Sequence, residues 1–302
     1  MVGLGEVLWD FLPSSKALGG APTNFAYITA LLGNRGIVAS RLGNDPLGIE
    51  ACRTMENLGL DTSYIQYDDR HGTGTASVSV DDRGQPAFKI AQPVAWDFLD
   101  WTHEWKSLSS HADVICFGSL AWRSTTSAQT IELFLQNTMP NAIRICDANL
   151  REPFYTPDTL RRAFGHANIL KINDQELALV SSLFGAPAEN ELAMAGHLLR
   201  QFGLKLICIT KGAHGSLLVS PSQTIVHPGF PVTVSDAVGA GDAFTACVAH
   251  YFVRHRSLEE ISELANRFAA WVATQVGATP QITSSKLLEL SSLTDQEMAS
   301  GS

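Results

Sequence analysis

Four short apolar segments recur through the middle of the chain at intervals of about thirty residues. None shows the alternation of apolar and polar positions that marks a strand with one exposed face. Such segments are typical of strands that are covered on both faces of a sheet. The predicted strands are Val114–Phe117, Ile143–Cys146, Ile169–Ile172 and Leu206–Thr210.

The segments between these strands have apolar residues spaced near the helical repeat of 3.6. The apolar positions are Ile131, Phe134 and Leu135 in one segment, and Leu192, Ala195, Leu198 and Leu199 in another. A regular succession of strand and helix is typical of the α/β class. We therefore predict a central, mostly parallel sheet with helices on both of its faces.

Polar residues and glycines follow each of the four predicted strands. The segments are Gly118-Ser119, Asp147–Arg151, Asn173–Glu176 and Lys211–Gly215. Open α/β sheets bind their ligands at the carboxyl ends of parallel strands. Loops are polar in any protein, but four such loops at one edge indicate a binding site there.

The region 60–92 has a different pattern, in which apolar and polar residues alternate. The strands it predicts, and the turn between the last two, are Tyr64–Tyr67, Thr75–Val80, Pro86–Ile90 and Asp81–Gly84. An antiparallel hairpin does not fit easily into a parallel core. We therefore expect a small antiparallel sheet, or lid, outside the core, formed from about 8–18 and 64–92.

The composition is that of an ordinary globular protein, with 302 residues, 45% of them hydrophobic and 17% charged. The formal charge of −9 disfavours nucleic acid and anionic membranes as partners. The longest apolar stretch, residues 243–253, is too short to span a bilayer. We expect neither nucleic acid nor a membrane as a partner.

The five cysteines are an odd number and form no CxxC pair. They therefore indicate buried thiols in a reducing compartment rather than a disulfide framework. The first residues lack the charged region and the cleavage site of a signal peptide. The expected location is cytoplasmic.

The strongest signal for chemistry lies at residues 235–244. Gly239, Ala240 and Gly241 precede a predicted amphipathic helix, whose first N–H groups would be free to bind an anion. Asp242 stands beside them, where it could accept a hydroxyl proton while the N–H groups stabilise a transferring phosphate. The alternative is that Asp242 only caps the helix.

Two nucleotide-binding motifs are excluded. Residues 239–244 lack the third glycine of the GxGxxG fingerprint, and no GxxxxGK[ST] motif occurs. A second glycine-rich segment, Gly19–Asn24, also precedes a predicted helix. From the residues alone it is either a turn or a binding site.

The order of several motifs resembles the ribokinase-like (PfkB) family of carbohydrate kinases. They span about residues 5–281 and are specific only in combination. The motifs are Gly19–Asn24, Arg41–Gly48, Asp147–Arg151, Asn173-x-x-Glu176, Thr210–Gly215 and Asp236–Asp242. Within the family, Gly5–Asp10, Gly19–Asn24 and Asp147–Arg151 are most similar to bacterial fructokinases.

The resemblance implies a ribokinase-like three-layer sandwich with a small antiparallel β lid, as a single domain over residues 1–302. It implies that Asp242 is the general base and that Gly239, Ala240 and Gly241 form the anion hole. The residues it places at the sugar hydroxyls are Asp10, Gly19, Gly20 and Asn24. Arg151 either pairs with a phosphate or bridges to a nearby carboxylate.

The resemblance also implies ATP and Mg²⁺ as cofactors. Asn173 and Glu176 match the element that organises magnesium, through water, and the nucleotide phosphates. Thr210, Gly212 and Gly215 match the nucleotide loop, and Asn266 matches a position beside the adenine. Many members bind K⁺ as well, and the matching positions are Asp236, Val238, Val272, Gln275, Gly277 and Gln281.

Two positions depart from the family pattern. Ala237 stands where a threonine is usual, which removes a hydroxyl near the anion hole. Lys211 stands where a leucine is common. Neither change affects the base or the magnesium element.

The function predicted is an ATP-dependent kinase of a small neutral sugar, fructose first. A 2-keto-3-deoxygluconate kinase shares much of the pattern, but its substrate carboxylate would call for an added cation in the sugar pocket. A regulator that kept the fold and lost the chemistry is a third hypothesis, disfavoured because Asp242 and Glu176 are both present. A Rossmann oxidoreductase is disfavoured by the glycine pattern. The lid of a second subunit would cover the apolar face of the first, so we expect a homodimer through the lid.

Overall fold

The computed structural model describes residues 1–12, 15–80, 86–187 and 189–292. Its centre is a nine-stranded sheet with the strand order β13-β12-β11-β10-β9-β8-β1-β4-β5. All neighbouring strands are parallel except the two pairs that involve β12. The strands are β1 (Val2–Leu4), β4 (Ile37–Gly43), β5 (Ile65–Asp68), β8 (Val114–Gly118), β9 (Ile143–Asp147), β10 (Ile169–Asn173), β11 (Leu206–Thr210), β12 (Ser216–Val219) and β13 (Thr224–His227).

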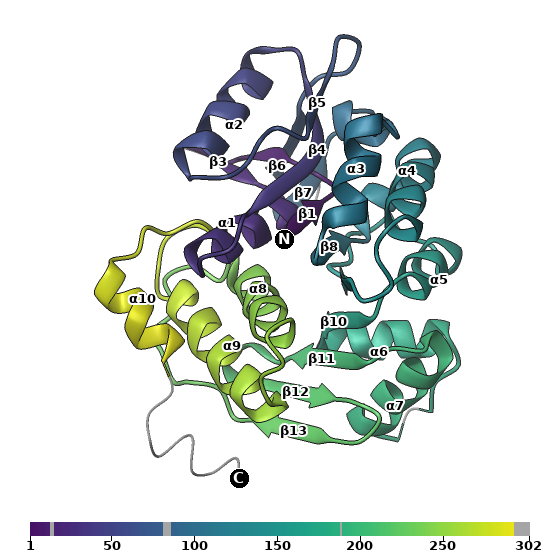
Figure 1. Cartoon of the computed structure of the whole chain (residues 1–302), viewed down its shortest axis with the longest axis vertical. Coiled ribbons are helices and arrows are strands. Elements are labelled where there is room, and N and C mark those ends of the chain that lie inside the picture. Colours follow the sequence, from purple (N-terminus) through teal and green to yellow (C-terminus); the bar gives the residue numbers. More distant parts are fainter. Residues whose placement is uncertain (13–14, 81–85, 188, 293–302) are drawn as a thin grey trace.

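Helices cover both faces of this sheet, which gives three layers (Figure 1). One face packs against α1 (Ala21–Leu31), α2 (Pro46–Asn57), α8 (Ala240–Phe252), α9 (Leu258–Ala273) and α10 (Ser284–Ser291). The other packs against α3 (His103–His111), α4 (Thr125–Gln136), α5 (Pro157–Gly165), α6 (Asp174–Leu183) and α7 (Glu191–Phe202). Short 3₁₀ turns are η1 (Ala95–Phe98), η2 (Leu120–Arg123) and η3 (Gly212–His214). The predicted α/β class is confirmed.

The four apolar segments form β8, β9, β10 and β11, as predicted. Nearly all of their residues are buried, because each strand has a neighbour on either side and helices on both faces. Four of the five cysteines are also buried, and all five thiols are free.

A second sheet of four strands has the order β3-β2-β6-β7. Its strands are β2 (Leu8–Phe11), β3 (Lys16–Gly19), β6 (Gly74–Val80) and β7 (Pro86–Ile90). The β6–β7 pair is the expected antiparallel hairpin, with Ala76 opposite Ile90. Its predicted turn, Asp81–Gly84, lies outside the described residues. The lid sheet is mixed rather than antiparallel, because β2 runs parallel to β6.

The prediction that the lid includes Tyr64–Tyr67 is wrong. This segment contributes β5, which pairs in parallel with β4 at the edge of the central sheet. As the last strand of the sheet, β5 has a neighbour on one side only, and Tyr67 is 50% exposed. The resulting alternation of polar and apolar residues is the same signal that a strand of a hairpin gives. The second part of the lid therefore begins at β6.

The start of α1 lies directly over the end of β1. A Cβ at Gly3 would overlap the carbonyl group of Pro22, and one at Gly5 would lie 3.3 Å from the Pro22 ring. The three residues after β1, Gly5–Val7, then lead into β2 of the lid sheet. The first turn of α1 is thereby held at the carboxyl edge of the central sheet, where the predicted site residues gather.

Candidate active site

The N-termini of α1 and α8 meet at the carboxyl edge of the sheet. Asn24, in the first turn of α1, donates a hydrogen bond of 2.7 Å from Nδ2 to Asp242 Oδ2. Asp242 is the third residue of α8, and the helix follows Gly239. Gly239 has a φ of +81°, and a Cβ there would lie 2.5 Å from Ala278 Cβ. Only glycine fits this turn.

Asp242 does not cap its helix. The N-terminus of α8 has no hydrogen bond from a capping side chain, since the carboxylate faces Asn24 instead. In the described part of the chain, the N–H groups of Gly241 and Asp242 donate to no protein acceptor. The turn therefore presents free donors and the positive end of a helix dipole beside a carboxylate.

The pKa of Asp242 is raised to about 6, chiefly because burial disfavours the charged carboxylate. The negative charge of Asp147 raises it further. The hydrogen bond from Asn24 and the positive charges of Lys171 and Arg151 act in the opposite direction. A carboxylate with this pKa is ionised at neutral pH and is a stronger base than an exposed aspartate.

Glu6 is a second acid at this place, and the sequence analysis gave it no role. It is only 2% exposed, and burial raises its pKa to about 7, with a further contribution from the charge of Asp242. Backbone N–H groups of Glu6 and Ala21, and the charge of Arg151, oppose the rise. In the sequence Glu6 is a lone acid in the apolar segment 2–9, and its burial depends on how α1 packs over β1.

The residues predicted to hold the sugar lie around the same space. Asp10, on β2, packs against Gly19, where a Cβ would overlap its Oδ2. A Cβ at Gly20 would lie 2.5 Å from the carbonyl oxygen of Glu6. Burial raises the pKa of Asp10, and the charge of Arg151 opposes the rise there as it does at Glu6 and Asp242. Arg151 is exposed and forms no ion pair with a carboxylate in the described part of the chain, where it donates only to the Leu150 carbonyl.

A buried charge pair supports the glycine turn from the sheet side. Lys171, on β10, donates from Nζ to Asp147 Oδ1 at 3.1 Å, and a Cβ at Gly241 would lie 2.9 Å from that Nζ. Thr245 donates to Asp147 Oδ2 at 3.1 Å and to the carbonyl of Gly241 at 2.9 Å. Sequence reasoning missed Lys171 and Thr245, which lie inside apolar segments and gave no signal of their own.

Asn173 and Glu176 are close together, and they form a reciprocal cap of α6. Asn173 Oδ1 accepts from the Glu176 N–H at 2.8 Å, and Glu176 Oε2 accepts from the Asn173 N–H at 3.0 Å. Glu176 Oε1 accepts from the N–H of Leu150, in the loop after β9, at 2.7 Å. Each carboxylate oxygen keeps a second lone pair, which fits contact with a metal ion through water.

The predicted nucleotide loop is a tight turn after β11. The N–H of Lys211 donates to the carbonyl of Gly215 at 2.8 Å, and Gly212 and Gly215 both have positive φ. Lys211 pairs with Glu191 at the start of α7, so this departure from the family pattern has an ionic partner. Thr210 is half-buried at the end of the strand. Asn266 is buried and donates to Ser216 Oγ and to the Ser262 carbonyl, each at 2.7 Å.

Asp236 holds two of the predicted K⁺-binding segments together. Its Oδ1 accepts from the Val238 N–H at 3.0 Å, and its Oδ2 accepts from the Gly277 N–H at 3.1 Å. Val272 and Gln275 lie at the end of α9, where the Gln275 N–H donates to the Val272 carbonyl. Gln281 is exposed. The turn before α8 is thus fastened to the segment after α9.

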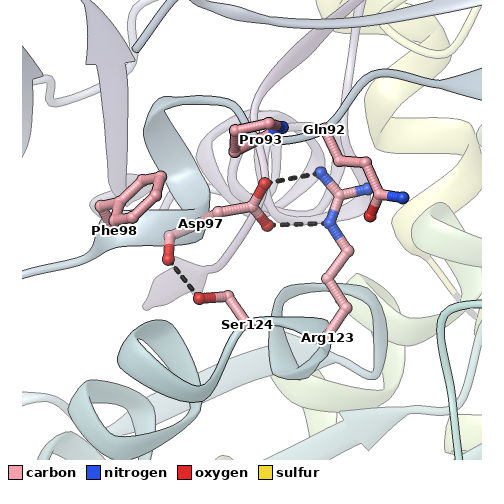
Figure 2. A pocket seen from close by; sticks show the side chains of 6 residues that line it. All are labelled: Gln92, Pro93, Asp97, Phe98, Arg123 and Ser124. Atoms are coloured by element: carbon pink, nitrogen blue, oxygen red, sulfur yellow. Dashed lines mark hydrogen bonds and ion pairs between the residues drawn. The ribbon is translucent and has the colours of Figure 1, made fainter. Parts of the chain in front are cut away.

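A cavity of about 450 Å³ lies outside this group of residues (Figure 2). Asp97 and Arg123 face each other in it with two hydrogen bonds of 2.8 Å, and Arg123 also donates to the Ala91 carbonyl beyond β7. The Arg123 guanidinium lies 3.9 Å from the centre of the Trp96 ring. These contacts fasten the end of the lid hairpin to η2. The residues that line the cavity are Gln92, Pro93, Asp97, Phe98, Arg123 and Ser124.

Membrane-spanning helices and clusters of metal-binding side chains are both absent from the described residues. Among the described residues, no helix combines the length and the hydrophobicity that crossing a bilayer requires. The same part of the chain holds no group of three or more His, Cys, Asp or Glu side chains arranged to bind a metal ion. A magnesium ion held mainly by phosphates and water needs no such group.

Comparison with known proteins shows similarity along almost the whole chain. Residues 14–284 match the model of the pfkB family carbohydrate kinases. A fructokinase of Escherichia coli is 29% identical, over 95% of this chain and 97% of that protein. A fructokinase of Xylella fastidiosa, solved with bound ATP, superposes with a TM-score of 0.82 at 24% identity, over 98% of each chain. A fructokinase of Vibrio cholerae O395, solved with fructose, ADP and potassium ion, has a TM-score of 0.81 at 25% identity, over 96% of this chain and 97% of that one.

Proposed function

Because this chain belongs to the pfkB family of carbohydrate kinases and is therefore a phosphotransferase acting on a sugar hydroxyl, we propose that it transfers the γ-phosphate of ATP to fructose. The observation that carries the proposal is the Asn24–Asp242 hydrogen bond beside the free N–H groups of α8. The named activity of the E. coli relative and the ligands of the V. cholerae structure support fructose as the acceptor.

Asp242 acts as the general base in this proposal. Its carboxylate takes the proton of the sugar hydroxyl as the oxygen attacks the γ-phosphorus. With a pKa of about 6, it is ionised at neutral pH and still basic enough to assist the attack. Asn24 holds the carboxylate in a fixed orientation, so the proton acceptor is in place before the sugar binds.

Gly239, Ala240 and Gly241 form the anion hole. The free donors at this turn are the N–H groups of Gly241 and Asp242. Both groups belong to the first turn of α8, which holds them in place. Such preorganised donors stabilise the charge that develops on the transferring phosphate. Lys171, beneath Gly241, adds a buried positive charge to the same place.

Asn173 and Glu176 would hold Mg²⁺ through water, and Thr210, Gly212, Gly215 and Asn266 would surround the nucleotide. When bound, magnesium neutralises charge on the nucleotide phosphates. The two segments joined by Asp236 are the proposed K⁺ site, which the potassium in the V. cholerae structure supports. These residues and Arg151 complete the proposed site.

The charge balance of the acceptor region favours a neutral sugar over a sugar acid. Glu6, Asp10 and Asp242 are three acids, and Arg151 is the one cation whose charge acts on all of them. A substrate carboxylate would add a fourth negative charge, and the other cation that acts on Asp242, Lys171, already pairs with Asp147. This disfavours a 2-keto-3-deoxygluconate kinase. The intact base and metal element disfavour an inactive regulator.

The proposal also includes a cytoplasmic homodimer that associates through the lid sheet. Phe11 and Leu12, at the end of β2, are 38% and 46% exposed, which supports an apolar contact surface there.

A panel of sugars tests the proposed substrate. Purified protein, ATP and Mg²⁺ are incubated with fructose, other neutral ketoses and aldoses, and 2-keto-3-deoxygluconate, and ADP release is measured. We expect the highest kcat/KM with fructose. A preference for the sugar acid would contradict the charge argument, and an absence of sugar-dependent ADP release would contradict the kinase.

A further inference from the structure

Glu6 is a buried acid beside the base that the proposed reaction leaves without a task. Its Oε2 atom is enclosed and has no hydrogen-bond partner in the described part of the chain. A buried, unpartnered carboxylate oxygen is costly and uncommon in native proteins. An acid kept in this position therefore calls for a reason beyond packing.

The backbone around Glu6 is firmly held. The N–H of Gly5 donates to the Ala39 carbonyl at 3.1 Å, and Ser40 Oγ donates to the Gly5 carbonyl at 2.6 Å. On the other side, the Gly20 backbone rests against the Glu6 carbonyl. The side chain interacts with the N–H of Ala21, in the same helical turn that carries Asn24. Asn24 in turn binds Asp242, so one turn of α1 contacts both acids.

The charged groups that face Glu6 are Asp242 from α8 and Arg151 from the loop after β9. Asp242 itself also faces Asp147 and Lys171. The pKa of Glu6 is about 7 and that of Asp242 about 6. Asp242 keeps the hydrogen bond from Asn24, which stabilises its charged form, whereas Glu6 Oε2 is enclosed and has no partner among the described residues. Glu6 is therefore the acid of the two whose neutral form its surroundings favour more.

We propose that Glu6 receives the sugar proton from Asp242 after each phosphoryl transfer, which returns Asp242 to its carboxylate form before the products leave. This inference rests on the proposed function. The acceptor O–H bond breaks and its proton goes to Asp242, while the acceptor oxygen bonds to the γ-phosphorus and ADP leaves with the electron pair of the broken P–O bond. The proton then passes from Asp242 to the ionised carboxylate of Glu6. Glu6 releases it to water when the products leave, so one proton per turnover reaches the solvent.

The wild-type protein already provides one test. The first turnover needs only an ionised Asp242, whereas repeated turnover also needs an ionised Glu6. Rapid-quench measurements of sugar phosphate, with the best acceptor from the panel, give both rates as functions of pH. We expect an acid limb near pH 6 for the first turnover and near pH 7 for the steady-state kcat. Coincident acid limbs would overturn the relay.

The variant Glu6→Gln provides the second test. It is expected to form one equivalent of product at the wild-type rate and then to turn over about tenfold or more slowly, since a positioned proton acceptor has been lost. Glu132 is a partly buried glutamate of α4 that pairs with Arg162 on the other face of the sheet. Glu132→Gln is therefore the matched control and should behave as wild type. An equal slowing of the first turnover and the steady state would indicate a structural role only and would overturn the relay.

Glu6→Ala separates the missing proton acceptor from a disturbed fold. The cavity that it leaves has room for formate, so formate should restore its steady-state rate but not that of Glu6→Gln, where the amide fills the space. Failure of formate to restore the rate would count against the relay. If the wild type phosphorylates no sugar at all, the proposed function itself fails, which is a different result from a wild type that turns over with coincident acid limbs.

Discussion

Asn24 and Asp242 are 218 positions apart in the chain, and a hydrogen bond of 2.7 Å joins their side chains. The bond connects the first turns of α1 and α8, which approach each other over the end of β1. It fixes the proposed base relative to the glycine segment Gly19–Gly20 that leads into α1. One contact thus joins the parts of the chain that carry the proposed sugar site and the proposed phosphate site.

Replacement of the base is the first test. Asp242→Asn keeps the size of the side chain but removes the proton acceptor, so we expect kcat to fall by roughly 10²–10⁴-fold. The melting temperature should change little, because Asp242 makes no capping bond to α8. Steady-state kinetics and thermal unfolding measure the two effects. Near-normal turnover would refute the base, and a large loss of stability with a small loss of rate would restore the capping role.

Asn24 should control the pH at which activity appears. Its hydrogen bond lowers the pKa of Asp242, so Asn24→Ala should raise that pKa and move the acid limb of kcat/KM upward by roughly one pH unit. Activity is lost as pH falls through the pKa of the base, since the protonated form cannot accept a proton. Asn34→Ala, just beyond the other end of α1, is the control and should leave the limb near pH 6. An unshifted limb in Asn24→Ala would show that the bond does not form in solution.

The buried, ionised Glu6 carboxylate should lower the free energy of unfolding above about pH 7. Its pKa is raised in the folded protein, so its favourable contribution is complete below pH 4.5 and is lost as pH rises through about 7. Relative to wild type, Glu6→Gln should therefore gain about 3 kcal/mol in the free energy of unfolding between pH 4 and pH 8. Urea denaturation at both pH values measures the difference. Glu132→Gln should show the opposite sign, because Arg162 lowers the pKa of Glu132.

The metal element predicts a change in magnesium dependence. Glu176→Gln should raise the Mg²⁺ concentration needed for half-maximal rate, because a neutral amide attracts the hydrated ion less strongly than a carboxylate does. Asp174→Asn alters an exposed acid two residues away and serves as the matched control. A Mg²⁺ titration that is the same for Glu176→Gln and wild type would argue that Glu176 only caps α6 and holds Leu150.

The lid gives the last prediction. If β6 and β7 form the contact between two subunits, sedimentation at micromolar concentration should show a homodimer. The double change Val78→Asp and Val80→Asp should weaken both the dimer and sugar binding, because it places charge at the apolar positions of an alternating strand. Leu133→Asp, an exposed apolar position on α4, is the control and should affect neither. A wild-type monomer would contradict the dimer, and normal sugar binding by the double variant would contradict the lid.

The sequence predicts the buried strands and the grouping of polar residues after them with little ambiguity, because a strand covered on both faces leaves a continuous apolar segment. It does not distinguish β5 from a hairpin strand, since apolar and polar residues alternate in both. It also does not decide whether Asp242 caps its helix or acts as a base. The direction of the Asp242 side chain depends on Asn24, which only the folded chain brings near. For a related reason, the sequence does not indicate that Glu6, Lys171 and Thr245 belong to the site. Their burial is set by helices that pack from distant parts of the sequence.

The short link between the two sheets has a mechanical consequence. Glu6 lies within the three residues that join β1 of the central sheet to β2 of the lid sheet, whereas Asp242 belongs to the helical layer of the body. A rotation of one sheet against the other would turn about these residues and alter the separation of the two acids. Their mutual repulsion would change with it, and so would the affinity of the site for protons. One member of the acid pair, Glu6, therefore lies in the link between the two sheets, so a displacement of the lid sheet would change the charge of the pair.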